Sequence, residues 1–286
     1  MKKIFFWMGL FLVVNHASCA SATSLHEEKP EHDKTAQVAP HGDAKQNEKA
    51  SHDKAPAATH KGPHWGYAGK TGADHWGSLD PAYKSCASGK EQSPIDITNL
   101  KTKDIENIRF HYRPSKLNIL NNGHTIQVDI DKGSSIRIDG EKYDLLQFHF
   151  HTPSEHAIEG IRYPMEIHLV HKSKKGELAV VGVMMVVDKH NSVLESLFDN
   201  FPGEEGKENL MDKIDVGALL PAGERTFRYP GSLTTPPCTE GVKWNLLLAP
   251  ISISNEQFTS FHDIFENNSR PVQPIRKRVI WEDTTP

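Results

Sequence analysis

Three histidines in two apolar segments have the spacing of a metal site. His149 and His151 alternate along the run 146–151, and His168 follows in a similar run, 165–171. Alternate side chains of a strand point to the same face, so His149 and His151 would lie together, and His168 would join them if the two strands were neighbours. Three imidazoles with one vacant coordination position are typical of catalytic rather than structural zinc.

Polar residues on the same strand faces support the prediction of a metal site. Gln147 shares a face with His149, and Glu166 shares a face with His168. Each could accept a hydrogen bond from the ring nitrogen that points away from the metal, which fixes the tautomer and orientation of the ring. The alternative is a set of histidines on a solvated sheet face, but it gives Glu166 no role on a mainly apolar strand.

The segments that carry these residues are predicted strands. Runs rich in β-branched and aromatic residues are separated by turn sequences such as 121–123, and helical patterns are few. Strands are expected at 117–119, 125–130, 135–138, 144–151, 165–171 and 178–187. Helices are expected at 192–200 and 255–266, the second with Ser254 as N-cap and Gln257 completing a capping box. Residues 63–286 are therefore predicted to form one predominantly β domain with a few surface helices.

The first 62 residues differ in composition from the predicted domain. Residues 1–22 combine a basic start, a short apolar run and small-residue cleavage patterns, and are predicted to be a secretory signal peptide. Residues 23–62 are rich in His, Lys, Glu and Ala and have almost no large apolar side chains, so a disordered linker is predicted. The apolar run is too short for a membrane-spanning helix, and no other segment is long and apolar enough.

Export determines the expected state of the cysteines. The short basic signal indicates a bacterial protein of the periplasm, with secretion beyond it as the alternative. Cleavage would remove Cys19 and leave Cys86 and Cys238, which are expected to form a disulfide in an oxidising compartment. Such a bridge would stabilise the fold by roughly 2–4 kcal/mol. Two free thiols are the alternative if the chain stays in a reducing compartment.

The overall charge argues against one class of partner. Lys and Arg number 33 and Asp and Glu number 37, so the net charge is −4 with neutral histidines. The whole chain lacks the basic footprint of a nucleic-acid-binding protein, and no such partner is expected. The composition does not decide between a monomer and a homodimer.

A series of motifs along 63–286 resembles the α-class carbonic anhydrases, in particular their exported bacterial members. The matching segments are 64–67, 92–97, 121–124, 147–151, 154–156, 166–171, 229–237 and 270–274. The resemblance implies a single α-carbonic-anhydrase-like domain with a large central, mostly antiparallel twisted sheet. It also implies a zinc lyase (carbonate dehydratase) with one Zn²⁺ per chain, which hydrates CO2 reversibly to bicarbonate and a proton by attack of zinc-bound hydroxide. Sulfonamides and small anions are expected inhibitors.

The same resemblance implies roles for particular residues near the metal. The zinc ligands would be His149, His151 and His168. Thr234 would accept the proton of the hydroxide and donate its own to Glu155, and Thr235 would contact bicarbonate. The single disulfide of exported bacterial members would correspond to Cys86–Cys238.

Further roles concern the substrate pocket and the path of the proton. The CO2 pocket would be lined by Val170, Val180, Leu233 and Trp244. His124 would be the proton shuttle, because imidazole has an unperturbed pKa near 6.5. The water chain leading to it would be ordered by Tyr67, Asn122 and Gln127, the last of which stands where many animal members have asparagine. The other histidines of the domain are expected to be structural or surface residues, namely His64, His75, His111, His156, His171, His190 and His262.

Two function classes other than an enzyme remain open at this point. One is a catalytically inactive module used for recognition, but such relatives usually lose zinc histidines, and all three are present here together with Thr234 and Glu155. The other is an exported metal-scavenging protein that uses the His-rich linker, because His-rich tracts can bind metal ions. In that case the linker, rather than the domain, would carry the function.

Overall fold

The computed structural model describes residues 62–223 and 225–284, which belong to one compact unit. The predicted signal peptide (1–22) and the predicted linker (23–62), apart from Gly62, lie outside the described residues. Within the described part of the chain, no helix has the length and apolar character needed to cross a membrane.

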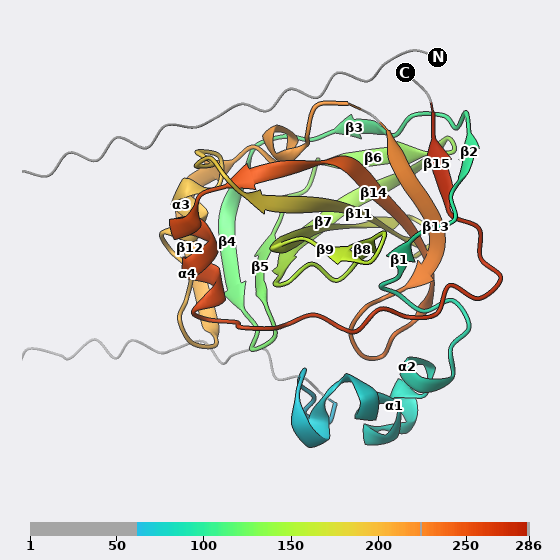
Figure 1. Ribbon diagram of the computed structural model, residues 1–286. Helices are drawn as coiled ribbons and strands as arrows, with labels where there is room; N and C mark the ends of the chain where they lie inside the picture. Colours follow the sequence, from blue (N-terminus) through green and yellow to red (C-terminus); the bar gives the residue numbers. More distant parts are fainter. Residues whose placement is uncertain (1–61, 224, 285–286) are drawn as a thin grey trace, which may run out of the picture. The chain divides into compact units, whose positions relative to one another are not determined.

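Most regular segments of the described residues are strands (Figure 1). The strands are β1 Asp96–Ile97, β2 Lys101–Lys103, β3 Arg109–His111, β4 Ser115–Asn121, β5 Ile126–Asp129, β6 Ser135–Ile138, β7 Glu141–His151, β8 Ala157–Ile158, β9 Ile161–Arg162, β10 Met165–Ser173, β11 Leu178–Val187, β12 Gly206–Ile214, β13 Thr226–Ser232, β14 Glu240–Ile253 and β15 Trp281–Asp283. The α-helices are α1 Trp76–Leu79, α2 Ser85–Ser88, α3 Glu195–Phe198 and α4 Asn255–His262. Short 3-10 turns occur at Gly69–Thr71, Ala73–His75, Pro81–Tyr83 and Val216–Leu219.

A twelve-stranded sheet is the centre of the described unit. Ten of its strands follow the order β12-β4-β5-β7-β10-β11-β14-β13-β15-β2, while β6 pairs with β7 and β3 pairs with β6. Only the β11–β14 and β15–β2 pairs are parallel in this sheet, and its other pairs are antiparallel. The predicted large, mostly antiparallel sheet is confirmed. A second sheet of three short strands has the order β1-β8-β9.

The two faces of the central sheet have different partners. On one face, Phe148 and Phe150 of β7 and Ile167 and Leu169 of β10 are buried in the main apolar core. Helices α3 and α4 contribute side chains to that core and lie together beside the strands. Since strand side chains alternate, the residues between these four face the other way and form the site described below.

The predicted helices exist but are shorter than expected. The helix expected at 192–200 is reduced to α3, because the side chain of Asn191 accepts a hydrogen bond from Val193 N and holds the preceding residues in a turn. The helix expected at 255–266 ends at His262. Its start is as predicted, with Ser254 and Gln257 forming a capping box.

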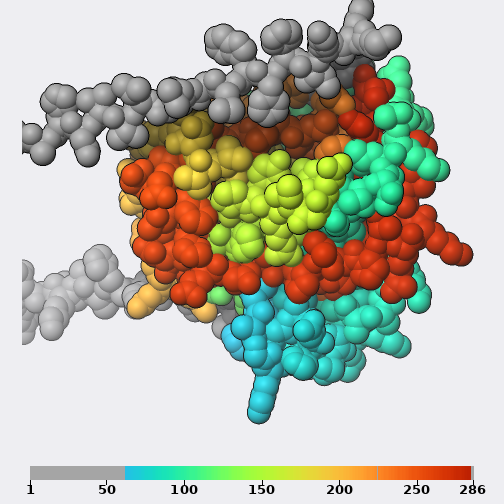
Figure 2. All heavy atoms as spheres, in the orientation of Figure 1, coloured from blue at the N-terminus to red at the C-terminus, as the bar shows by residue number. Residues whose placement is uncertain are grey.

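A small apolar cluster, separate from the main core, joins the N-terminal helices α1 and α2 to the rest of the domain. Trp65 and Trp76 pack there against the disulfide between Cys86 and Cys238, which confirms the expected pairing. Figure 2 shows the segment that follows α4, in red, crossing one face between the yellow-green β8–β9 hairpin and the blue N-terminal residues. The disulfide and this crossing segment together fix the N-terminal helices beside the residues of the site.

Candidate metal centre

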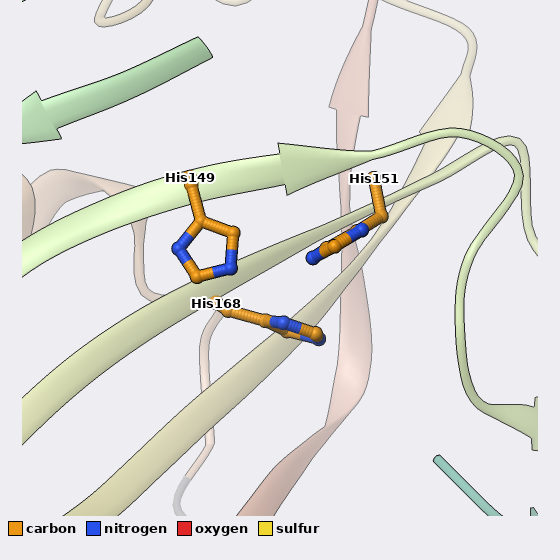
Figure 3. A group of neighbouring side chains, drawn as sticks. All are labelled: His149, His151 and His168. Atoms are coloured by element: carbon orange, nitrogen blue, oxygen red, sulfur yellow. The ribbon is translucent and has the colours of Figure 1, made fainter. Parts of the chain in front are cut away.

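The register of β7 and β10 brings the three predicted histidines together. His168 of β10 lies directly opposite His149 of β7, and His151 lies two residues further along the same strand face. The three imidazoles point toward one another (Figure 3). One ligand nitrogen from each ring lies within 4.8 Å of the others, so a single ion could contact all three.

Two of the rings are oriented by the polar side chains that the strand pattern singled out. Nδ1 of His149 donates to Oε1 of Gln147 at 2.9 Å, and Nε2 of His168 donates to Oε1 of Glu166 at 2.8 Å. These oxygens can only accept, so the ring nitrogen beside each carries the hydrogen. The remaining nitrogen of each ring therefore keeps a lone pair for a metal.

The third ring is oriented by a residue that the sequence reasoning did not identify. Nδ1 of His151 donates to the main-chain carbonyl of Asn268 at 2.7 Å. Its Nε2 is buried and has no hydrogen-bond partner among the described residues. Every residue type has a main-chain carbonyl, so the identity of residue 268 could not reveal this contact. Only the resemblance of the motif 270–274 to a known family pointed to this part of the chain.

Burial and mutual repulsion keep the β7 histidines neutral. Burial, followed by the charges on His151 and His168, holds the pKa of His149 well below its usual range. Burial also lowers the pKa of His151, although the carboxylate of Glu155 opposes the shift. Neutral imidazole is the form that binds metal ions, so this environment suits ligation.

The carboxylate of Glu166 has the opposite effect on the β10 histidine. Burial favours the neutral forms of both Glu166 and His168. It is outweighed at Glu166 by the attraction of His156 and then of His168, and at His168 by the attraction of Glu166. The pKa of Glu166 is therefore well below its usual range, with His156 as a second partner at 2.8 Å, and the pKa of His168 is raised. An ionised Glu166 makes the His168 ring a more basic metal ligand.

The donor set fits a zinc ion. Three imidazoles, each anchored through its other nitrogen, match the ligands of catalytic zinc sites and leave a fourth position open. The Nε2 atom of His151, which is buried and has no hydrogen-bond partner among the described residues, is the clearest sign of a metal site. A buried polar atom without a partner lowers the stability of the fold by about 1–3 kcal/mol unless something binds to it.

Glu155 lies directly beside the three rings. It is fully buried, and its Oε1 accepts a hydrogen bond from the main-chain N–H of Arg270 at 2.8 Å. Its Oε2 lies 3.5 Å from Nε2 of His151 and 3.8 Å from Nδ1 of His168. That oxygen has no hydrogen-bond partner among the described residues, so the expected bond from Thr234 is not formed here.

Thr234 and Thr235 lie in a closed loop after β13. Leu233 N donates to Thr239 O at 2.9 Å, and Cys238 N donates to Thr235 O at 2.8 Å. The loop therefore ends at the disulfide, which ties it to α2. Thr234 itself is buried, with 5% of its surface exposed.

The four residues expected to line a CO2 pocket belong to one apolar cluster. Val170, Val180 and Trp244 stand side by side on β10, β11 and β14. Leu233 packs against the same cluster from the loop after β13. The ring of Trp244 lies 4.8 Å from that of His168, centroid to centroid, so the cluster borders the metal ligands.

The predicted shuttle residue lies in the turn between β4 and β5. Oδ1 of Asn122 accepts hydrogen bonds from the main-chain N–H groups of His124 and Thr125, both at 3.0 Å. Gly123 between them has φ +81°, a left-handed conformation that glycine adopts readily. The ring of His124 stacks on Trp65 at 3.7 Å between centroids.

The other residues expected to order water behave differently from one another. The buried hydroxyl of Tyr67 has no partner among the described residues, and burial raises its pKa well above the usual value. Gln127 lies opposite His149 but donates from Nε2 to Asp129 at 2.7 Å. The sequence reasoning did not include Asp129, although it shares a strand face with Gln127.

Two further buried histidines, His156 and His171, contact polar side chains. His156 is fully buried between Glu166 and the hydroxyl of Tyr229, which lies 2.6 Å from its Nε2. His171 is buried in contact with the hydroxyl of Tyr112, 2.8 Å from its Nε2. Burial lowers the pKa of His171 to about 3, so this residue is neutral at ordinary pH.

The fold and the site define a class of protein, a twisted β-sheet domain with a three-histidine candidate metal centre beside an apolar cluster. Comparisons identify the family. A model of the eukaryotic-type carbonic anhydrase family matches residues 71–284. A carbonic anhydrase from Nostoc sp. is 42% identical over 225 residues, which cover 76% of this chain and 85% of that protein. One from Klebsiella pneumoniae is 41% identical over 223 residues, covering 77% and 91%.

A solved structure agrees with these relatives. The α-carbonic anhydrase from Thermovibrio ammonificans, in complex with the inhibitor sulfanilamide, has a TM-score of 0.75 and 42% identity over 77% of this chain and 99% of that chain. This chain belongs to the eukaryotic-type, or alpha, carbonic anhydrase family. It is therefore an enzyme, a lyase of the class that hydrates CO2.

Proposed function

We propose that the chain hydrates CO2 reversibly to bicarbonate and a proton with one zinc ion held by His149, His151 and His168. The observation that carries the proposal is the convergence of three anchored imidazoles, one of which has a buried nitrogen without a partner. When bound, zinc supplies Lewis-acid chemistry, because it lowers the pKa of a coordinated water to about 7, the value characteristic of carbonic anhydrases themselves.

The apolar cluster beside the metal ligands suits the substrate. CO2 carries no charge and no net dipole, so burial against Val170, Val180 and Trp244 costs it little hydration. Leu233 lies in the adjoining loop and completes the apolar contacts. We assign these four residues to CO2 and Thr235 to the bicarbonate that leaves.

We assign to Glu155 and Thr234 the role of selecting which ligand binds at the metal centre. Oε1 of Glu155 is occupied by the Arg270 N–H, so Oε2 is the acceptor that remains for the Thr234 hydroxyl. A hydroxyl that donates to Glu155 has only lone pairs to offer on its other side. It therefore favours a ligand that carries a hydrogen of its own and disfavours one that cannot donate.

Inhibitor binding follows from the same site. The Thermovibrio ammonificans relative was solved with sulfanilamide, and a primary sulfonamide nitrogen combines a metal-binding atom with a hydrogen to donate. We propose that sulfonamides bind this chain at the metal centre, and that small anions bind there also.

The periplasm is the proposed location of the protein. The Cys86–Cys238 disulfide supports this proposal, because disulfides form and persist in an oxidising compartment.

Metal analysis combined with stopped-flow CO2 hydration tests the proposed function. Purified protein is expected to contain about one zinc per chain and to lose hydration activity in step with zinc when a strong chelator is applied. Activity should return when zinc is added back, while magnesium, which prefers oxygen ligands, should not restore it. Full activity in a metal-free preparation would refute the proposal.

His124 is assigned the export of the proton that each hydration releases. Replacing His124 with alanine should lower kcat by roughly tenfold or more, in the range of losing a general acid–base group, while kcat/KM and zinc content stay close to those of the parent. The reason is that kcat/KM reports CO2 conversion, whereas kcat also includes later proton release. Imidazole buffer should restore part of kcat. An unchanged kcat in weak buffer would contradict the assignment.

A further inference from the structure

The side chain of Asn268 connects the metal-ligand strand to the turn that carries His124. Its Nδ2 donates to the main-chain carbonyl of His124 at 3.0 Å and to that of Phe150 at 2.9 Å. Its Oδ1 accepts from the main-chain N–H of Thr152 at 2.8 Å. Phe150 and Thr152 are the chain neighbours of His151, so one amide holds both sides of a metal ligand.

The orientation of this amide is fixed by its partners. Asn268 is fully buried, so its polar atoms depend on protein contacts. An asparagine amide offers two N–H groups and one oxygen, and all of these have partners here. Exchanging the nitrogen and the oxygen would set a donor against the Thr152 N–H and an acceptor against two carbonyls, so the opposite orientation is excluded.

The main chain of Asn268 adds a third connection. Its carbonyl accepts from Nδ1 of His151 at 2.7 Å, and its N–H donates to Thr152 O at 3.0 Å. The backbone therefore orients the metal ligand, whereas the side chain holds the His124 turn. A substitution at 268 removes the side-chain link between the turn and the residues that flank His151, while the main-chain carbonyl that orients the His151 ring stays in place.

A second side chain, that of Thr125, also links the turn to the strand. Thr125 Oγ1 donates to Phe150 O at 2.6 Å, so both anchors converge on the same carbonyl. The Asn122 side chain organises the turn internally but does not reach the metal-ligand strand. The His124 main chain is thus tied to the metal-ligand strand by the Asn268 amide directly and by Thr125 one residue later.

From these contacts we infer that Asn268 is a positioning residue for proton export, which sets the His124 turn relative to the metal centre through its side-chain amide. This inference rests on the proposed function, because it takes His124 as the shuttle. Its consequence is that losing the amide hydrogens slows proton export and leaves CO2 conversion intact.

The test is the kinetics of Asn268→Asp and Asn268→Ser in CO2 hydration. A carboxylate at 268 can still accept from Thr152 but repels the two carbonyls, and a serine is too short to keep both bonds. Because displacement of a catalytic group by about 1 Å can cost up to 100-fold, we expect kcat to fall by roughly 3- to 10-fold in both variants. The values of kcat/KM and zinc per chain should stay within about twofold, and imidazole should restore part of kcat.

A matched control and a double variant separate positioning from general damage. Asn191 donates from Nδ2 to Ser252 O and accepts from Val193 N, contacts of the same kind away from the site. Asn191→Asp should show no drop in kcat relative to kcat/KM. In a His124→Ala background, Asn268→Asp should lower kcat by no further factor, because the group that it positions is already gone.

Each result has a definite meaning. Equal losses of kcat and kcat/KM, loss of zinc, or an additive effect in the double variant would overturn the positioning role of Asn268. A normal kcat in Asn268→Asp and Asn268→Ser, with a reduced kcat in His124→Ala, would also overturn it while leaving the shuttle assignment standing. A normal kcat in His124→Ala would refute the shuttle assignment itself, and the inference would fall with it.

Discussion

Replacing His168 with alanine is expected to remove bound zinc and nearly all CO2 hydration activity. The change takes away one of three metal-facing nitrogens and leaves Glu166 with His156 as its remaining side-chain partner. Loss of a partner outside the metal's ligands costs about 10–100-fold in metal affinity, so loss of a ligand should exceed that range. The measurement is zinc per chain by elemental analysis, together with kcat/KM for CO2 from stopped-flow assays.

Two further variants make this prediction specific. Glu166→Gln keeps the shape of the side chain but removes its charge, so it should weaken zinc binding by about 10–100-fold without abolishing it. His111→Ala removes an exposed histidine on β3 and should change neither zinc content nor kcat/KM. If His168→Ala retained one tightly bound zinc and normal hydration, the three-histidine centre would be wrong.

The position of the metal ligands could be predicted because it depends on local periodicity. The alternation of side chains along a strand placed His149 and His151 on one face and Phe148 and Phe150 on the other, and the structure has that arrangement. Pairing of the two strands was the only tertiary assumption needed for His168. The orienting side chains, Gln147 and Glu166, followed from the same periodicity.

Other parts of the site have no local signature. Asn268 and Arg270 lie in a segment without regular structure, 117 and 115 residues away from His151 and Glu155, the site residues that their main chains contact. Both use main-chain atoms for their main contacts to the site, so any residue type could in principle make those bonds. Only tertiary structure, or resemblance to a family, could identify them.

Several strands also escaped prediction for physical reasons. β12 is an edge strand whose residues are mostly exposed and polar, so it lacks the apolar alternation of a half-buried strand. β14 contains Pro250, which lowers strand propensity, yet it runs from Glu240 to Ile253 beside β11 and β13. In each case the partner strand, rather than the intrinsic preference of the segment, determines the structure.

Replacing Arg270 with methionine is expected to lower the free energy of unfolding by roughly 2–4 kcal/mol, because several buried acceptors lose their donor. The side chain is almost completely buried and donates to Gln92 Oε1, Ser93 O and Cys86 O at 2.7–2.9 Å. Burial lowers its pKa to about 10 against the opposing effect of Glu155, so it remains charged near neutral pH. Its guanidinium also lies over the ring of Trp76, 5.6 Å from the centroid.

Urea unfolding at equal zinc saturation measures this effect, since bound zinc itself stabilises the native state. Arg109→Met is the matched control, because the Arg109 side chain is 74% exposed, and it should change stability by less than about 0.5 kcal/mol. The main-chain N–H that holds Glu155 is present in both variants. Folded Arg270→Met protein should therefore still bind one zinc, whereas a loss of zinc without a loss of stability would show that the guanidinium acts on the metal centre rather than on the packing of the N-terminal helices.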